Sequence, residues 1–413
     1  MAQATARRDD RPLRVLTLAP LPASVTGGIE EYAYGVVAGL RERGCELRVA
    51  TSQIDTPPGQ AAAGGDVALR TVRLLERPIP WSPTVLLRLL REVRRADLVH
   101  LHMPYPMVEA LGALLARIAG RPLVVTYQMD AILLPEPGAA RPTRAARAIG
   151  RIYRSLSARW PLRVASVVVT STRAYVGESV LLPEFAGKVR IIYQGVSRER
   201  FREATPDRIA RSRRERLGSR YAKLVTFVGR LVPYKGVDYL LEAIPQVRTP
   251  GVLFVIGGSG PQDPHLRALA ARLGLTNVRF EGFVPSEELF GLFAASDLVV
   301  SPSVSELENT PISLLGARAV GTPVIGTSIG GTGETVPNDG HLGRIIPPRD
   351  SAGLARAIEE VLGRPRPPAA ADRPRFWEDV ADDYLDLFHE VLRENGPVPA
   401  SRRSSGASAP ERV

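Results

Sequence analysis

Short apolar runs rich in Val, Ile and Leu alternate with longer stretches of helical periodicity, and this alternation occurs twice along the chain. The first series covers residues 13–19, 47–51, 98–101, 123–127 and 167–170, and the second covers 224–228, 252–256, 278–280, 298–301 and 323–325. Near-continuous apolar strands of this kind are typical of parallel sheets that helices cover on both faces. The sequence therefore predicts two doubly wound α/β domains, and a length of 413 residues favours the same division.

Changes in composition indicate where these domains begin and end. Residues 1–11 are polar and are expected to be disordered, and the N-terminal domain is expected over 12–197. Residues 198–222 carry many charges and few apolar side chains, which favours an interdomain linker before a C-terminal domain over 223–375. The apolar spacing of residues 376–392 predicts an amphipathic helix within 376–395. The tail, 396–413, is rich in Pro, Ser, Ala and Arg and is expected to be disordered.

The chain carries a net charge of +11, and almost all of its basic residues are arginine. A GC-rich genome accounts for such a bias, whereas an anionic partner, such as a membrane surface or a phosphorylated substrate, is the functional alternative. Aromatic residues make up only 6% and are not interleaved with the arginines, which argues against nucleic-acid binding. No apolar run approaches the roughly 18 residues of a membrane span, so an integral membrane protein is not expected.

The residues that most often bind metals are sparse. Cys45 is the only cysteine, which excludes an intramolecular disulfide and a cysteine-based zinc site. His265, His341 and His389 have no neighbours at metal-ligand spacing. The polar N-terminus has no apolar stretch typical of a secretory signal. We therefore expect a cytoplasmic protein that needs neither a metal ion nor a cofactor.

Two loops that each connect a predicted strand to a predicted helix could bind phosphate. In the first, Gly27 and Gly28 let the backbone approach a ligand closely at a helix start, although a structural turn explains them equally well. In the second, Phe227-Val-Gly-Arg-Leu-Val-Pro-Tyr-Lys-Gly236, Arg230 and Lys235 can both point over one helix N-terminus. Two cations there predict a metal-free diphosphate site, and a solvated basic loop is the alternative.

A third segment joins a strand to a helix around Glu308, in Glu308-Asn-Thr-Pro-Ile-Ser-Leu-Leu-Gly-Ala-Arg-Ala-Val-Gly-Thr-Pro323. A carboxylate at a helix N-terminus can simply cap the helix. The carboxyl end of a parallel strand is also where ligand sites of α/β proteins lie. Glu308 is therefore a candidate ligand-binding residue.

Together these segments resemble the family-4 retaining glycosyltransferases of GT-B fold. The resemblance runs from about residue 13 to 392 in the expected order, and the further segments that carry it are Asp97-Leu-Val-His-Leu-His102, Val125-Thr-Tyr-Gln-Met-Asp130, Ile191-Ile-Tyr-Gln194-Gly-Val, Val255-Ile-Gly-Gly-Ser-Gly-Pro261, Phe280-Glu-Gly-Phe-Val284, Ala295-Ser-Asp297-Leu and Gly330-Gly-Thr-Gly-Glu334. It implies two Rossmann-like domains facing across a cleft, with the C-terminal helix packing back toward the N-terminal domain.

The resemblance also implies roles for individual residues. Arg230 and Lys235 would neutralise the departing diphosphate of a UDP- or GDP-sugar, with the Gly27–Gly28 loop on its other side, and Glu308 would contact the donor sugar. Val284 would meet the base through its backbone. The other positions matched to donor or acceptor binding are His102, Gln128, Asp130, Gln194, Gly229, Asn309, Thr310, Pro311 and Ile312. The acceptor is not identified; lipid-linked, cell-envelope and natural-product precursors are candidates.

Three positions depart from the family pattern. The second glutamate of the family's pair, which binds the nucleotide ribose, would fall at Gly316, and taking Glu306 as the first glutamate does not restore it. Gln128 stands where the family has a histidine, and Gln194 stands where it has an asparagine. Glutamine forms hydrogen bonds but cannot take up a proton or carry a positive charge. A catalytically impaired auxiliary or scaffolding protein of GT-B fold is therefore the alternative hypothesis.

Two further features allow both a structural and a functional interpretation. The segment from Arg141 to Arg163 contains seven arginines and no acidic residue. It predicts either a domain helix with a solvated arginine face or a surface that docks on anionic lipid near a membrane acceptor. His100 and His102 alternate at the end of a strand. We expect His102 to face the cleft, and a core histidine is the alternative.

Overall fold

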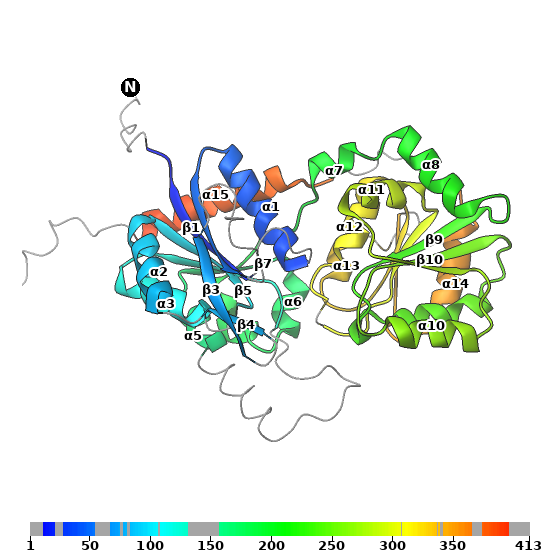
Figure 1. The fold of residues 1–413 in the computed structure, drawn as a ribbon, viewed down its shortest axis with the longest axis horizontal. Helices are drawn as coiled ribbons and strands as arrows, with labels where there is room; N and C mark the ends of the chain where they lie inside the picture. The colour runs from blue at the N-terminus through cyan, green and yellow to red at the C-terminus, as the bar shows by residue number, and fades with distance from the viewer. Residues whose placement is uncertain are drawn as a thin grey trace, which may run out of the picture.

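The computed structural model describes residues 11–20, 28–53, 67–74, 77–80, 83–105, 108–130, 157–306, 308–336, 338, 342–365 and 374–395. They form two lobes, each built on a sheet with helices on both faces (Figure 1). The prediction of two doubly wound α/β domains is confirmed. Every predicted strand is present, with ends within two residues of the predicted ones.

The N-terminal sheet has the strand order β4-β3-β2-β1-β5-β6-β7-β8, and only the edge pair β3 and β4 is antiparallel. Strand β1 lies between β2 and β5, with Thr17 opposite both Val49 and His100, so the chain order switches direction there. The strands are β1 (Arg14–Ala19), β2 (Glu46–Gln53), β3 (Val67–Leu74), β4 (Arg77–Pro80), β5 (Leu98–Met103), β6 (Leu123–Tyr127), β7 (Val167–Thr170) and β8 (Val189–Ile191).

Helices cover the two faces of this sheet with two separate apolar clusters. One face packs against α2 (Pro83–Arg95), α3 (Val108–Ile118) and α5 (Arg159–Val164). The other packs against α1 (Gly28–Glu42) and α15 (Trp377–Glu394). Between β7 and β8 the chain forms α6 (Arg173–Glu178) and the 3₁₀ segment Leu182–Lys188.

The C-terminal sheet is parallel throughout, with the order β11-β10-β9-β12-β13-β14. Its strands are β9 (Lys223–Val228), β10 (Val252–Gly257), β11 (Val278–Gly282), β12 (Leu298–Ser301), β13 (Val324–Thr327) and β14 (Gly343–Ile346). One face packs against α9 (Val237–Ala243), α10 (Asp263–Arg272) and α14 (Ser351–Leu362). The other packs against α8 (Pro206–Leu217), α11 (Ser286–Ala295) and α12 (Ile312–Ala319), and the short α13 (Thr332–Thr335) follows β13.

The expected linker, 198–222, is a linker only in part. It forms α7 (Arg198–Arg202) and α8, and α8 covers the C-terminal sheet. The side chain of Thr205 accepts a hydrogen bond from Arg208 N at the start of α8, and Pro206 occupies its first turn. Two apolar positions, Ile209 and Leu217, are enough to pack this charged helix on the C-terminal core. Because this segment has so few apolar residues, its sequence pattern did not predict the helix.

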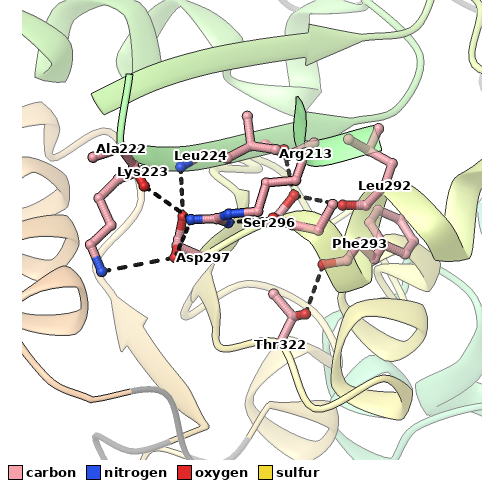
Figure 2. A network of polar contacts seen from close by, with 11 residues as sticks. Arg213, Ala222, Lys223, Leu224, Leu292, Phe293, Ser296, Asp297 and Thr322 are labelled. Carbon is pink, nitrogen blue, oxygen red and sulfur yellow. Dashed lines mark hydrogen bonds and ion pairs between the residues drawn. The ribbon is translucent and has the colours of Figure 1, made fainter. Parts of the chain in front are cut away.

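A polar network fixes α8 to the sheet (Figure 2). The guanidinium of Arg213 donates to the Asp297 carboxylate at 3.0 Å, to the carbonyl of Ala295 at 2.7 Å and to that of Ala222 at 2.9 Å. Asp297 also accepts from Leu224 N at 2.7 Å, which links the starts of β9 and β12. The second half of the expected linker therefore belongs to the C-terminal domain.

Helix α15 follows the C-terminal lobe in sequence but packs on the N-terminal one, as expected (Figure 1). It lies against α1, where Gly35 and Gly39 leave room for the ring and backbone of Trp377. An isolated parallel bridge pairs Phe376 with Val196 just before this helix. Helix α15 thereby closes the apolar cluster on the α1 face. None of the described helices is long and apolar enough to cross a bilayer.

Candidate active site between the lobes

The carboxyl ends of the two sheets are joined by hydrogen bonds of the loop that follows β12. Asn309, in the loop after β12, donates from Nδ2 to the carbonyl of Gln128 at 3.0 Å and to Thr170 Oγ1 at 3.2 Å. Its Oδ1 accepts from Thr172 Oγ1 at 2.7 Å. Thr310 adds a bond of 3.3 Å to the hydroxyl of Ser171. The expected substrate residues Asn309 and Thr310 therefore join the lobes directly.

The loop after β9 places Lys235 at this junction. It passes through the 3₁₀ turn Pro233–Lys235 and ends at Gly236, whose φ of +62° is unfavourable for other residues. A Cβ atom on Gly236 would lie 2.2 Å from the carbonyl oxygen of Pro302, so glycine also lets the loops after β9 and β12 touch. This contact brings Lys235 to the Glu308 carboxylate, which also accepts from Ser303 Oγ at 2.9 Å.

Lys235 and Glu308 form an ion pair shielded from solvent. Their side chains are 16% and 8% exposed. Burial by itself would lower the pKa of Lys235, but the charge and hydrogen bond of Glu308 outweigh it, and the pKa is raised above its ordinary value. Lys235 therefore remains a cation, with Glu308 as its counter-ion.

Arg230 is exposed beside this pair, in the same loop as Lys235. The positive charge of Arg230 lowers the pKa of Lys235. It also lowers the pKa of Glu30, in the first turn of α1. The pKa of Glu30 is raised by burial, and Arg230 counteracts part of that rise. Gly229 precedes Arg230, and a Cβ atom there would lie 3.8 Å from Lys235 Cε. The two predicted cations therefore lie near each other, and Arg230 also lies within electrostatic reach of α1.

The glycine loop completes the group from the N-terminal side. Gly28 begins α1 as predicted, and Gly27 lies outside the described residues. A Cβ atom on Gly28 would be 3.3 Å from Ile312 Cδ1, at the start of α12 behind its N-cap, Pro311. The amide of Gln128 donates to the carbonyl of Ile29 at 3.3 Å. The structure thus assembles predicted residues from both domains around Glu308.

Asp130 lies apart from this group. Its carboxylate accepts from the hydroxyls of Tyr127, Tyr175 and Ser179 and from Val180 N, at 2.7, 3.2, 3.1 and 3.1 Å. These bonds attach the end of β6 to α6 and the segment that follows it. In this structure the carboxylate therefore has a structural role, in contrast to the expected substrate contact.

The expectation that His102 faces the cleft is wrong. His100 and His102 are two residues apart in a strand, so both rings lie on one face of the sheet, and both are fully buried. Their ring centroids are 4.3 Å apart, and His100 also packs on Tyr384 and Phe388 of α15. Desolvation lowers the pKa of His102 to about 3. Both are core histidines.

Two other expected residues lie at neighbouring positions. Gln194 is buried just before Gly195, which packs on the backbone of Phe376 at the start of α15. Val284 is half-buried after β11 and touches the end of β10, where a Cβ atom on Gly257 would lie 2.7 Å from its Cγ2. Neither has a described hydrogen bond or ion pair to Lys235 or Glu308.

A second set of contacts between the lobes was not predicted from the sequence. Gly330, with a φ of +55°, lies against the backbone of Glu308, and its N–H donates to the carboxylate of Glu178 at 2.9 Å. Glu334 accepts from the backbone N–H of Arg173 and from the hydroxyl of Tyr193. The only sequence feature that pointed to these contacts was the Gly-Gly-Thr-Gly-Glu segment, residues 330–334. This segment contacts the Glu308 loop and forms hydrogen bonds to α6.

The arginine-rich segment is described only at its end. Residues 131–156 lie outside the described residues, and with them most of the expected basic helix from Arg141 to Arg163. In the described remainder, Trp160 and Leu162 pack on the N-terminal core and Arg159 pairs with Glu184. The described residues contain no group of three or more His, Cys, Asp or Glu side chains arranged to hold a metal ion.

The fold and the residues at the junction define a glycosyltransferase of GT-B fold. Residues 26–200 match the profile Glycosyltransferase Family 4, and residues 222–364 match Glycosyl transferases group 1. D-rhamnosyltransferase WbpZ of Pseudomonas aeruginosa is 30% identical over 346 residues, which are 83% of this chain and 85% of that protein. The chain belongs to glycosyltransferase family 4.

Two other proteins extend this comparison. O-antigen chain mannosyltransferase C of Escherichia coli is 30% identical over 375 residues, which are 89% of this chain and 95% of that protein. The crystal structure of HepE from Anabaena in complex with UDP has a TM-score of 0.68 at 21% identity, covering 92% of this chain and all of that one. The structural similarity supports the fold assignment, and the sequence matches establish membership of the family.

Proposed function

We propose that this protein transfers a sugar from a nucleoside-diphosphate sugar to an acceptor hydroxyl, with retention of the anomeric configuration and without a metal ion or a prosthetic group. The observation that carries the proposal is the buried Lys235–Glu308 pair together with Arg230, whose charge acts on Lys235 and on Glu30 in the first turn of α1. The printed names of two relatives describe a rhamnosyltransferase and a mannosyltransferase. Solved structures of HepE hold UDP and UDP-glucose, which supports a nucleotide-sugar donor.

The proposed chemistry is electrostatic. When the bond between the anomeric carbon and the β-phosphate oxygen breaks, negative charge collects on the departing diphosphate. Arg230 and Lys235 neutralise that charge in a site fixed before the reaction begins, which is the kind of stabilisation that lowers a barrier most. Glu308 accepts hydrogen bonds from hydroxyls of the donor sugar. Gly28 lets the α1 backbone approach the phosphates.

One observation favours the alternative, a GT-B protein that has lost donor turnover. Gly316 stands where the family carries its ribose-binding glutamate, and its Cα is buried against α11. A Cβ atom there would lie 2.9 Å from Cε2 of Phe293. The loss of a charge-assisted hydrogen bond to ribose weakens nucleotide binding by roughly ten- to a hundredfold.

Calorimetric titration with UDP and GDP distinguishes these functions. We expect one nucleotide to bind the wild type and to bind Arg230→Ala and Lys235→Ala about a hundredfold more weakly, because each variant removes a charged donor to phosphate. Arg356→Ala removes an equally charged side chain, 72% exposed on α14, and is the matched control. No binding of either nucleotide to the folded wild type would favour the auxiliary protein.

A second variant separates donor binding from turnover. Glu308→Gln removes the counter-ion of Lys235 while keeping a similar shape, so diphosphate binding should be retained or strengthened. Hydrolysis or transfer of the cognate nucleotide sugar should fall by about a hundredfold, because the neutral amide is a weaker acceptor for the sugar hydroxyls. Unchanged turnover in this variant would remove Glu308 from the proposed site.

A further inference from the structure

Exposed apolar side chains gather on two neighbouring helices of the N-terminal lobe. Leu86 and Leu87 on α2 are 44% and 67% exposed, and Leu114 and Ile118 on α3 are 43% and 63% exposed. These four are half of the large apolar side chains that the described part of the chain exposes. Single exposed leucines are common on protein surfaces. Exposed apolar side chains that form a contiguous patch on adjoining elements, in contrast, indicate an interaction surface.

Helical spacing puts these side chains outward. On α2, Val85, Leu89 and Val93 are buried in the core, whereas Leu87, Arg91 and Arg94 follow one another along the opposite face. On α3, Leu115 faces the core, and Leu114, Arg117 and Ile118 are exposed. A hydrogen bond of 2.8 Å from Arg121, just beyond α3, to the carbonyl of Arg94 links the two helices.

The same surface is strongly basic. Its exposed arginines are Arg88, Arg91, Arg94, Arg95 and Arg117. The acidic residues of the two helices, Glu92 and Glu109, are buried, and Glu92 pairs with Arg48 at 2.9 Å. Helices α2 and α3 therefore expose cations and apolar side chains but no carboxylate.

We propose that the outer faces of α2 and α3 form a docking surface for an anionic lipid bilayer. Alternating leucine and arginine on an amphipathic helix fit the boundary between headgroups and acyl chains, where leucine enters the apolar layer and arginine binds lipid phosphate. Both helices lie on the side of the N-terminal lobe turned away from the C-terminal lobe (Figure 1). The side chains named for this surface are on α2 and α3, and none of them belongs to the segment between Arg141 and Arg163.

Vesicle flotation of the full-length protein tests this proposal without any nucleotide or acceptor. We expect binding to vesicles of phosphatidylcholine mixed with phosphatidylglycerol, weaker binding at high salt, and none to phosphatidylcholine alone. Arg91→Ser/Arg94→Ser should bind about 25-fold more weakly, at about fivefold for each arginine near an anionic surface. Leu86→Ser/Leu87→Ser should bind about tenfold more weakly.

The matched control is Arg211→Ser/Arg214→Ser, which removes two exposed arginines from α8 on the other lobe. It should bind vesicles like the wild type. Equal losses in both arginine pairs would mean a net-charge effect, and retained binding in both α2 variants would move the contact to another segment; either result overturns the proposal. So would a wild-type dimer, seen by sedimentation velocity, that the leucine variant abolishes. Circular dichroism confirms that each variant is folded.

Discussion

The hydroxyl of Thr172, at the carboxyl end of the N-terminal sheet, donates a hydrogen bond of 2.7 Å to Asn309 in the C-terminal domain, and both side chains are buried. Asn309 is the immediate neighbour of Glu308. A side chain that joins the lobes is therefore one residue from the carboxylate that we place on the donor sugar, so we expect closure and the position of Glu308 to be coupled.

Asn309→Ala should open the lobes. It removes three hydrogen bonds between the domains, each with a net value of about 1 kcal/mol, so the ratio of closed to open molecules should fall roughly a hundredfold. Small-angle X-ray scattering should record a larger radius of gyration. Asn277→Ala is the control, because its side-chain amide bonds only within the C-terminal domain. An unchanged scattering curve for Asn309→Ala would contradict the assigned role.

The Lys235–Glu308 pair should show strong coupling in a double-mutant cycle. Lys235→Ala or Glu308→Ala alone leaves one buried charge without its partner and should cost about 3 kcal/mol of unfolding free energy. The double variant should cost less than the sum, since no unpaired charge remains. Urea denaturation measures each term. The exposed pair Arg267 and Asp263 should couple by only about 0.5 kcal/mol, and equal coupling in the two pairs would argue against a buried ion pair.

The buried histidines should make the N-terminal lobe sensitive to acid. Desolvation holds the pKa of His100 well below its usual value and that of His102 at about 3, so the unfolded chain binds protons that the folded chain does not. Stability should fall as the pH drops below the unfolded histidine pKa of about 6.5, by about 2 kcal/mol per histidine between about pH 7 and pH 5.

His102→Leu tests this expectation. Neither ring nitrogen of His102 has a hydrogen-bond partner among the residues that the structure describes, so the substitution removes no described hydrogen bond and should reduce the acid dependence. Thermal unfolding across this pH range measures the slope. His389→Gln, which replaces an exposed histidine of α15, is the control. A slope in His102→Leu equal to that of the wild type would mean that His102 does not titrate on unfolding.

Gly316→Ala should destabilise the protein despite the higher helix propensity of alanine. The new Cβ atom would lie 2.9 Å from the buried ring of Phe293, and overpacking of this kind costs about 1–3 kcal/mol. Gly177→Ala, in α6, meets no atom within 4 Å and should be neutral or stabilising. Adding Phe293→Leu to Gly316→Ala should recover part of the loss. Urea midpoints compare the variants, and a stabilised Gly316→Ala would show that α12 has room for a side chain.

Most of the strands predicted from the sequence are buried on both faces, because a continuous apolar run is typical of that environment; the exception is β11, a half-buried edge strand. The sequence pattern did not predict β8, whose three residues are half-buried or exposed, the edge strands β4 and β14, or β3, which lies next to the edge. It also identified Asp97 and Asp297 only as separate motif pieces. In the structure, each accepts from the backbone N–H of a strand in its own domain, Arg14 at 3.1 Å and Leu224 at 2.7 Å.

The candidate site was predictable as a set of residues but not as an arrangement. Arg230, Lys235, Glu308 and Gly28 were all identified from loops that follow strands, because parallel sheets bring such loops to one edge. Lys235 and Glu308 are 73 positions apart in the sequence, so the local sequence around either residue does not predict that they form a pair. The turn of Asn309 toward the other domain depends on lobe placement, which neither domain's sequence pattern encodes.

The packing of α15 on α1 reverses the order in which the two lobes can be completed during synthesis. A ribosome releases the N-terminal lobe first, yet the cluster on its α1 face needs Trp377, Tyr384 and Phe388, which are made after the whole C-terminal sheet. The first lobe to emerge therefore waits with an uncovered apolar face while the second lobe folds. Chaperones should therefore bind the nascent chain most during that interval. We expect a nascent chain stalled before residue 377 to bind them most strongly.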